Sequence, residues 1–403
     1  MSRREMLAAV TGVAAGAVAG CGRQAPVRIA VVWSSDELRS FQSLLRGNRQ
    51  NATVYSAGDN IATVLRGPST RVLPDVAVIP RLGLLRDDII ADRLKPVGSA
   101  DPAFWRELAT ARDGQVVGSW FKSSHKSLVW HRGTASQPAD WDDWTAELHE
   151  RAAHGPPLAI GAADGWMLTD WFENHLLGHA PQVYARLADD PAAWADDAVR
   201  QSLDALAELW RTPGLFPGGG RTALTQQFHD ALLDVFRYRR ADMVVAPDFA
   251  WPVIAKYGTD AANAGLFRFP GAGRTRPLVV GGDLAVALTD PGAVFVTWLA
   301  GADVRDQLEG WARQGGFLAP YLDASLAPRL LRGPARELRA LDGAAYDLSD
   351  RLTGGLAGGD GRGLWRILTR LFTAVAVEDV PTREAVAEAV RDLRANSGGT
   401  GGR

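Results

Sequence analysis

Carboxylates, histidines and a single cysteine are the side chains of this chain whose types and spacing could carry chemistry. The sequence contains no serine nucleophile elbow (G-x-S-x-G), no H-E-x-x-H zinc motif and no Walker A loop. His175 and His179 stand four residues apart on a predicted helix, but no carboxylate ligand accompanies them. Asp142 and Asp143 stand at a predicted helix start, where the helix dipole stabilises acidic side chains without catalysis. The sequence therefore predicts no catalytic centre, no metal site and no cofactor.

The single cysteine, Cys21, follows a segment with the features of an export signal. Arg3 and Arg4 give this segment a positive start, and the apolar residues 6–18 come next. The apolar stretch is too short and too weakly hydrophobic to span a membrane, which takes about 20 residues. The paired arginines also fit a twin-arginine signal, so the Sec and twin-arginine export routes both stay open.

The residues around the cysteine indicate how it is used. The sequence VAGC, residues 18–21, resembles a bacterial lipobox, in which the cysteine thiol receives a diacylglyceryl group. Two or more acyl chains anchor a protein stably, because each buried CH₂ group contributes about 0.8 kcal/mol. We therefore expect a signal peptide over residues 1–20, a lipidated tether over residues 21–26, and a mature protein anchored at the outer face of the cytoplasmic membrane.

The composition is that of a globular protein without a strong preference for charged partners. Of the 403 residues, 46% are hydrophobic and 22% are charged, and the net charge is -2. A nucleic-acid-binding surface would show clustered basic residues, so this class of function is not expected. The length predicts two domains or one large two-lobed unit. Most of the 14 tryptophans are expected in the core, and a minority around a pocket.

Strand and helix patterns alternate at the start of the predicted mature chain. Apolar runs at positions 27–33 and 76–79 predict buried strands, and residues 52–56 predict a further strand between them. Helices are expected between them at residues 36–46 and 59–66. This alternation is typical of an α/β fold with a parallel sheet.

Glycines divide the later part of the pattern. Two separate strands are expected at residues 278–280 and 284–288, on either side of Gly281 and Gly282. The glycine-rich end of the chain, residues 396–403, is expected to be disordered.

Six groups of short segments form an ordered set along the chain. They are FKSSHKSLVW (residues 121–130), ADWDDW (139–144), IGAADGW (160–166) with TDW (169–171), ADM (241–243) with Pro247, GGDL (281–284) and GGFLAP (315–320). Together they resemble the bacterial extracellular solute-binding proteins of family 1, which serve carbohydrate ABC importers, and are closest to the α-glucoside-binding branch. The resemblance covers residues 27 to about 321, although the helical region after Gly178 is compact and cannot be matched singly.

The resemblance implies a two-lobed periplasmic-binding-protein fold of the α/β class, with a ligand cleft between the lobes. The chain would cross between the lobes several times. The expected division is a first lobe over 27–129 and 281–324, a second lobe over 130–280 with helices from 325–395, and the tail 396–403.

The same resemblance implies a function. Such a protein captures a sugar, here an α-glucoside or oligosaccharide, by closure of the cleft and delivers it to the permease subunits of an ABC transporter. It would be a monomer, it would need no cofactor, and it would not be an enzyme.

Sugars stack on aromatic rings and form hydrogen bonds with side chains such as Asp, Asn, Arg and Lys. In the first lobe, Trp33 ends the first strand and belongs either to the pocket or to the core. Asp59 and Asn60 follow the second strand and are ligand groups or a helix cap. Asp283 follows two glycines that let a backbone approach a ligand. Phe317, with Tyr321, either covers the cleft or packs.

In the second lobe the strongest candidate is Trp166, which follows a strand and an Asp-Gly turn and would stack on a sugar ring. Asp164 would be its polar neighbour. Asp170 lies about one helical turn beyond Trp166 and would face the same cleft. Trp251 is the second aromatic candidate, with Phe249 beside it.

Two other functions remain open from the sequence. The same fold could bind another polar solute such as a polyamine, which would need clustered carboxylates as well as aromatic rings. Alternatively, a glycan-acting hydrolase could use Asp164 and Asp170 as an acid–base pair, about 5–9.5 Å apart across the scissile bond.

Overall fold

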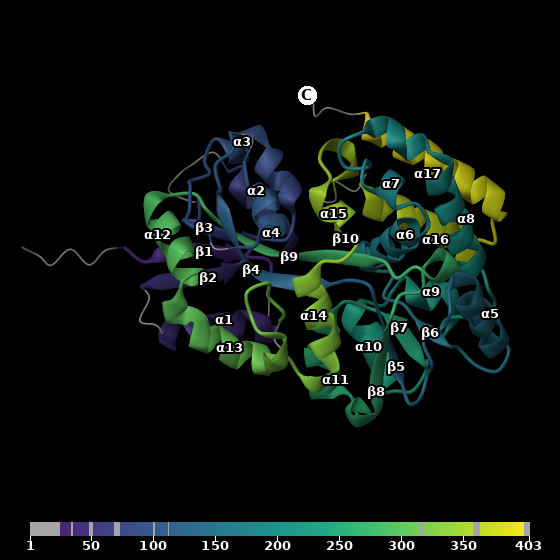
Figure 1. Cartoon of the computed structure of the whole chain (residues 1–403). Helices are drawn as coiled ribbons and strands as arrows, with labels where there is room; N and C mark the ends of the chain where they lie inside the picture. Colours follow the sequence, from purple (N-terminus) through teal and green to yellow (C-terminus); the bar gives the residue numbers. More distant parts are fainter. Residues whose placement is uncertain are drawn as a thin grey trace, which may run out of the picture.

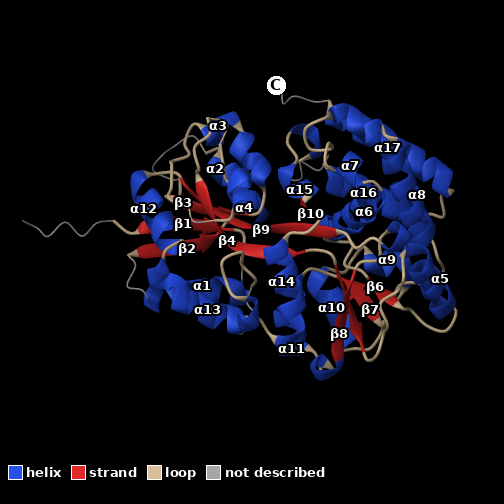
Figure 2. Ribbon diagram, in the orientation of Figure 1, coloured by secondary structure: helices blue, strands red, loops and turns tan. Residues whose placement is uncertain are grey.

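The structure is a computed structural model, which describes residues 25–33, 35–47, 51–67, 73–99, 101–111, 113–314, 317–357 and 363–398. Two β-sheets, each flanked by helices, form two α/β lobes side by side (Figures 1 and 2). The expected α/β class and two-lobed architecture are confirmed. The predicted signal peptide and Cys21 lie outside the described residues. No helix in the described ranges is both long and apolar enough to cross a membrane.

The sheet of the first lobe has six strands in a mixed arrangement. Its strands are β1 (Val27–Val31), β2 (Ala52–Ser56), β3 (Val76–Ile79), β4 (Gly118–His125), β9 (Leu278–Ala287) and β10 (Ala344–Tyr346). β1 pairs in parallel with β2 and β3, as the alternating pattern predicted. β9 runs antiparallel to both β3 and β4, so the parallel strands that the pattern predicted are part of a mixed sheet. The reason is that β9 enters this sheet from the other lobe, without the helical crossover that parallel pairing requires.

Helices cover both faces of this sheet, which explains the continuous apolar runs in its strands. Ala30 of β1 belongs to the core on one face, and its neighbours Ile29 and Val31 belong to the core on the other face. The associated helices are α1 (Ser35–Gly47), α2 (Ile61–Leu65), α3 (Asp88–Ala91), α4 (Ala103–Leu108), α12 (Asp290–Leu299) and α13 (Arg305–Arg313).

Strand β9 is continuous through the two glycines that were expected to divide it. A β-carbon at Gly282 would lie 2.2 Å from the carbonyl oxygen of Lys122 on β4. The glycine is therefore needed because two strands approach closely at this point. The expectation that the glycines separate two strands was wrong. The backbone that approaches Gly282 closely is that of β4.

The sheet of the second lobe has four strands in the order β6-β7-β5-β8. They are β5 (Leu128–Arg132), β6 (Leu158–Ala159), β7 (Met243–Val245) and β8 (Ala264–Arg268). The larger helices of this lobe are α5 (Trp141–Ala152), α6 (Gly165–His179), α8 (Asp197–Trp210), α10 (Phe228–Phe236), α11 (Trp251–Tyr257), α16 (Leu364–Ala376) and α17 (Thr382–Ser397). The shorter helices are α7 (Pro181–Tyr184) and α9 (Gly219–Ala223).

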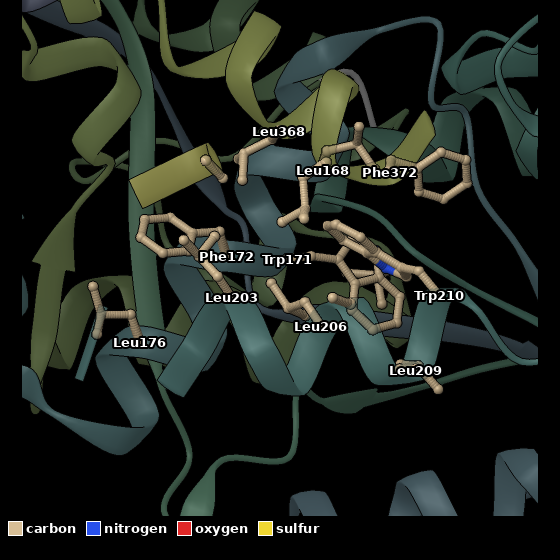
Figure 3. Packing of buried hydrophobic residues seen from close by; sticks show 14 of the residues in the cluster. Leu168, Trp171, Phe172, Leu176, Leu203, Leu206, Leu209, Trp210, Leu368 and Phe372 are labelled. Carbon is tan, nitrogen blue, oxygen red and sulfur yellow. The ribbon is translucent and has the colours of Figure 1, made fainter. Parts of the chain in front are cut away.

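The core of the second lobe is built mainly between helices. Leucine and aromatic side chains of α6, α8 and α16 interdigitate (Figure 3). The residues labelled there are Leu168, Trp171, Phe172, Leu176, Leu203, Leu206, Leu209, Trp210, Leu368 and Phe372. Burial of this much aromatic and leucine surface is expected to hold α6 rigid, and α6 carries several candidate site residues at its start.

Three chain segments connect the lobes: β4 to β5, β8 to β9, and β10 to α15 (Leu348–Arg351), while α14 (Arg332–Ala340) lies between the lobes (Figure 1). The backbone amide of Lys126, between β4 and β5, donates to the carbonyl of Val279 on β9 (2.9 Å). The amide of Asp347, after β10, donates to the carbonyl of Val280 (2.7 Å). The three connections are thus bonded together at one place.

The last helix is longer than expected. α17 ends at Ser397, whose hydroxyl donates to the carbonyl of Arg394, and the Asn396 amide donates to the carbonyl of Asp392. The prediction that disorder begins at residue 396 was therefore wrong for Asn396 and Ser397, and the Ser397 hydroxyl satisfies one of the last four carbonyls of the helix, that of Arg394. Residues 399–403 lie outside the described residues.

Candidate ligand-binding site

The first lobe contributes a polar group at the end of β1 and the middle of β9. The indole Nε1 of Trp33 donates to the carboxylate of Asp283 (2.9 Å). The ammonium of Lys122 lies 3.6 Å from the same carboxylate and also contacts the carboxylate of Glu37 on α1. Trp33 and Asp283, two of the predicted site residues, are therefore in direct contact although 250 residues separate them.

Aromatic rings surround this polar group. Trp33 packs on Phe41 and Phe121, and Phe317 stacks on Phe121 at 5.5 Å. Phe317 is buried, and the hydroxyl of Tyr321 donates to the carbonyl of Phe121 (3.0 Å). Of the two alternatives for Phe317 and Tyr321, the structure has them packed against the aromatic rings of the first lobe.

Asp59 and Asn60 lie in the turn between β2 and α2. Asn60 is exposed and stands at the N-cap position of α2, but its side chain makes no capping hydrogen bond. The side chain of Asp59 lies outside the described part of the structure. Their participation in ligand binding stays a prediction.

Half-buried aromatic rings of the second lobe lie at helix starts. Trp166 begins α6 and lies 5.4 Å from Phe228 and 6.0 Å from Phe249 between ring centroids. Trp251 begins α11 and stacks on the buried Trp130 at 6.4 Å. Trp166, Phe249 and Trp251 are only partly covered, so part of each ring remains available to a ligand.

Asp164 and Asp170 have protein partners. The carboxylate of Asp164 accepts the backbone amide of Phe228 (2.7 Å), which joins the starts of α6 and α10. Asp170 is almost fully buried and lies 3.5 Å from the ammonium of Lys126. Because Asp170 is buried, its position does not support the expectation that it faces the same opening as Trp166. Ligand binding by Asp164 and Asp170 stays a prediction.

Two further residues were not found from the sequence. The guanidinium of Arg81, just after β3, lies 5.2 Å from the ring of Trp365, the second residue of α16 in the other lobe. A β-carbon at Gly165 would lie 2.8 Å from the Cβ atom of Trp365, so the starts of α6 and α16 pack directly together. Trp365 therefore lies near the start of α6 at the lobe boundary, where the first lobe meets it through Arg81. From the sequence, only the fact that residue 365 is a tryptophan could have suggested it as a candidate site residue.

Burial shifts the pKa values of two ionisable side chains near the Trp33–Asp283 contact. Burial lowers the pKa of Lys122 to about 8, and the Asp283 carboxylate acts in the opposite direction. Burial raises the pKa of Asp248 to about 7, although its carboxylate accepts the backbone amide of His125 (2.6 Å). The charges of Lys122 and Lys126 act in the opposite direction on the pKa of Asp248, so its carboxylate lies within electrostatic reach of both lysines.

A second buried polar cluster lies at the connections between the lobes. Lys126 contacts Asp347 and Asp170, and burial raises the pKa of Asp170 to about 7. Glu173 accepts the hydroxyl of Tyr184 and the amide of Leu348. Because these groups come from β4–β5, α6 and α15, the cluster joins the elements about which the lobes would move.

No three described side chains of the metal-binding types converge on one point. His175 packs against Trp141 at 4.6 Å, and burial lowers the pKa of His175 to about 3. A surface depression of about 640 Å³ lies elsewhere on the second lobe and is lined mostly by charged side chains, including Glu147, Arg151 and Asp242. Arg151 pairs with both carboxylates, so we assign the candidate site to the lobe boundary, where aromatic and polar groups meet.

Comparison with known proteins relates the chain to solute-binding proteins. It is 27% identical to an osmoprotective compounds-binding protein of Synechocystis, over 76% of this chain and 79% of that protein. It is 25% identical to an alpha-glucosides-binding periplasmic protein of Rhizobium meliloti, over 62% of this chain and 61% of that protein. No protein-family model matches the chain.

Solved structures support the fold. The chain is similar to the binding protein RafE in complex with raffinose, with a TM-score of 0.68 at 15% identity, over 92% of this chain and 98% of that one. It is also similar to the cyclic alpha-maltosyl-1,6-maltose binding protein from Arthrobacter globiformis, with a TM-score of 0.63 at 16% identity and the same coverage. The resemblance to extracellular solute-binding proteins is thus confirmed.

Proposed function

We propose that this chain is the substrate-binding protein of an ABC importer, which binds an α-glucoside or oligosaccharide between its lobes and delivers it to the permease. The names of the two relatives support a solute-binding role, and one of them binds alpha-glucosides. The chain would act as a monomer outside the cytoplasmic membrane.

The observation that carries this proposal is a set of partly uncovered tryptophans in the second lobe. Trp166, Trp251 and Trp365 each stand in the first turn of a helix. Flat aromatic faces bind the apolar faces of pyranose rings, whereas Asp283 and Arg81 of the first lobe can bond to hydroxyl groups. Stacking from one lobe and hydrogen bonding from the other would favour a neutral ring with many hydroxyls.

Capture would proceed by closure of the lobes. A ligand that contacts both lobes binds the closed form more tightly than the open form and shifts the population toward it. Closure would bring Arg81 and Asp283 toward a sugar stacked on Trp166. The connections around Lys126 and Asp347 would absorb the change in backbone angles.

We propose no catalytic step. Asp164 accepts the Phe228 amide and Asp170 pairs with Lys126, so the two carboxylates of a hydrolase mechanism are engaged in the fold. Incubation of a bound sugar with the protein, followed by chromatography, tests this. Recovery of the sugar unchanged is expected, and turnover at a rate abolished by Asp164→Asn would establish a hydrolase.

The experiment on the main proposal is a thermal-shift screen of the mature chain against α-linked sugars. A ligand at a thousand times its Kd should stabilise the folded state by about 4 kcal/mol and raise Tm. Sugars with β linkages and uncharged linear polyols serve as comparisons. If no carbohydrate raises Tm, the sugar assignment is wrong.

Anchoring at Cys21 is tested separately. Because the chain has one cysteine, incorporation of labelled fatty acid would report on this residue alone. The wild-type protein should fractionate with membranes, and Cys21→Ser should be released. Equal membrane association of the two forms would contradict a lipid anchor.

A further inference from the structure

The ammonium of Lys122 is enclosed by four aromatic rings. It lies 4.0 Å from the ring centroid of Trp33, 5.2 Å from Trp311, 5.8 Å from Phe121 and 6.0 Å from Phe317. All four distances fall within the range of cation–π attraction. Only 6% of the Lys122 side chain is exposed. We call these four rings the aromatic cage.

Carboxylates complete the surroundings of this ammonium. Asp283 lies 3.6 Å away, and Glu37 is in direct contact. The Glu37 side chain is 41% exposed, so the group reaches solvent on this side. Aromatic rings together with carboxylates are the arrangement by which proteins bind ammonium and quaternary ammonium ligands. Here a side chain of the protein occupies it.

We propose that Lys122 is a specificity-determining residue, whose ammonium fills the aromatic cage and restricts the site to uncharged, polyhydroxylated ligands. The proposal rests on the proposed function for the location of the ligand. It deepens that function by excluding one class of solute, the polyamines and other ammonium compounds.

Charge pairing around the site agrees with this exclusion. Asp283 and Glu37 share Lys122, and Asp36 pairs with Lys256. An incoming ammonium group would have to displace Lys122 from both the rings and the carboxylates. The displaced lysine would then lie beside the new cation in a buried environment, where like charges repel strongly. A neutral ligand meets no such repulsion and can accept a hydrogen bond from Lys122.

The test removes the internal cation and supplies an external one. Lys122→Ala deletes three methylene groups and the ammonium, which n-propylammonium can replace. Thermal shift and calorimetry should detect millimolar n-propylammonium and putrescine binding to Lys122→Ala, at least about tenfold more tightly than to wild type. n-Propanol, which has the same shape without the charge, should give no comparable shift.

Two variants serve as controls. Lys122→Met keeps the cage filled without a charge and should not respond to n-propylammonium. Lys95→Ala removes a lysine that pairs with a carboxylate, Asp290, within the first lobe, but 44% of its side chain is exposed. It should not respond either, since no enclosed cavity is left.

Each result decides the proposal. Wild-type protein that binds putrescine as tightly as Lys122→Ala would overturn it, as would a folded Lys122→Ala that ignores n-propylammonium. Should Lys122→Ala fail to fold, refolding yield with n-propylammonium becomes the readout: recovery supports the cage, and no recovery, or equal recovery in n-propanol, contradicts it. Because no sugar is used, failure here is distinct from failure of the sugar screen, which uses wild-type protein.

Discussion

Asp36 on α1 and Lys256 on α11 form an ion pair that joins the two lobes. The bond lowers the pKa of Asp36 and raises that of Lys256. A second pair, Arg86 with Asp189 at 2.7 Å, joins the lobes through other elements. Both pairs are solvent-exposed, so each is expected to contribute little to folding and to be screened by salt. They are placed to bias the equilibrium between open and closed lobes.

Lys256→Ala should therefore open the unliganded protein without unfolding it. Its radius of gyration by small-angle X-ray scattering should exceed that of wild type at low salt, and the two should converge at high salt. Arg370→Ala, which breaks a pair with Asp392 inside the second lobe, is the matched control. Equal scattering from all three proteins would show that the Asp36–Lys256 pair does not influence lobe closure.

Loss of the Trp166 ring should weaken ligand binding much more than it weakens the fold. Trp166→Ala is expected to raise the Kd of a bound sugar about 10- to 100-fold, since a stacked aromatic residue at the centre of a site carries about 2 kcal/mol or more. Trp298→Ala removes a half-buried tryptophan of α12 in the first lobe and should leave Kd unchanged. Calorimetry measures both, and similar losses for the two variants would reject Trp166 as a stacking residue.

Local patterns were sufficient to predict much of this molecule. The apolar runs of β1 and β3 predicted buried strands at the right places, because strands covered on both faces need continuous apolar residues. The edge strand β2 was also predicted at the right place, although its side chains are half-buried or exposed. Trp166 became a candidate because it follows a strand and a turn and because of the family resemblance, and its role in binding stays a prediction. The three-residue strand β10 was missed, since Ala344–Tyr346 is too short to show any periodicity.

Long-range pairing could not be predicted in the same way. Lys122 reads as a surface lysine in sequence, and only the fold brings it beside Glu37 and Asp283. Trp365 is distant in sequence from every other candidate and joins them because α16 packs on α6. The partners of such residues are set by tertiary packing, which one sequence does not reveal.

Replacement of the buried Lys126 should be severely destabilising. Lys126→Met would leave Asp347 and Asp170 buried without their cation, at a cost of about 3–5 kcal/mol in the free energy of unfolding. Adding Asp347→Asn to Lys126→Met should recover part of that loss, because one uncompensated charge disappears. Urea unfolding measures both. Lys95→Met, at a half-exposed lysine that pairs with Asp290 at 3.6 Å, should cost less than about 1 kcal/mol. A similar small cost for Lys126→Met would contradict the role assigned to the cluster.

The carboxyl group of Asp248 should make stability fall as pH rises. Burial raises its pKa to about 7 in the folded protein, whereas an unfolded aspartate titrates near about 3.9. The folded state therefore binds more protons between these values, and the free energy of unfolding contributed by Asp248 is lost as pH increases through this window. Asp248→Asn tests this, because its side chain keeps an oxygen that can accept the His125 amide and does not titrate.

Relative to wild type, the free energy of unfolding of Asp248→Asn should rise by on the order of a few kcal/mol between about pH 4 and pH 7, with no further change above that range. The charges of Lys122 and Lys126 both lower the pKa of Asp248, so urea unfolding is compared over the range in which both lysines keep their charge. Asp142→Asn, at an exposed carboxylate on α5, controls for the loss of an acidic side chain. A stability difference between Asp248→Asn and wild type that does not change with pH would show that Asp248 is ionised in the folded protein throughout.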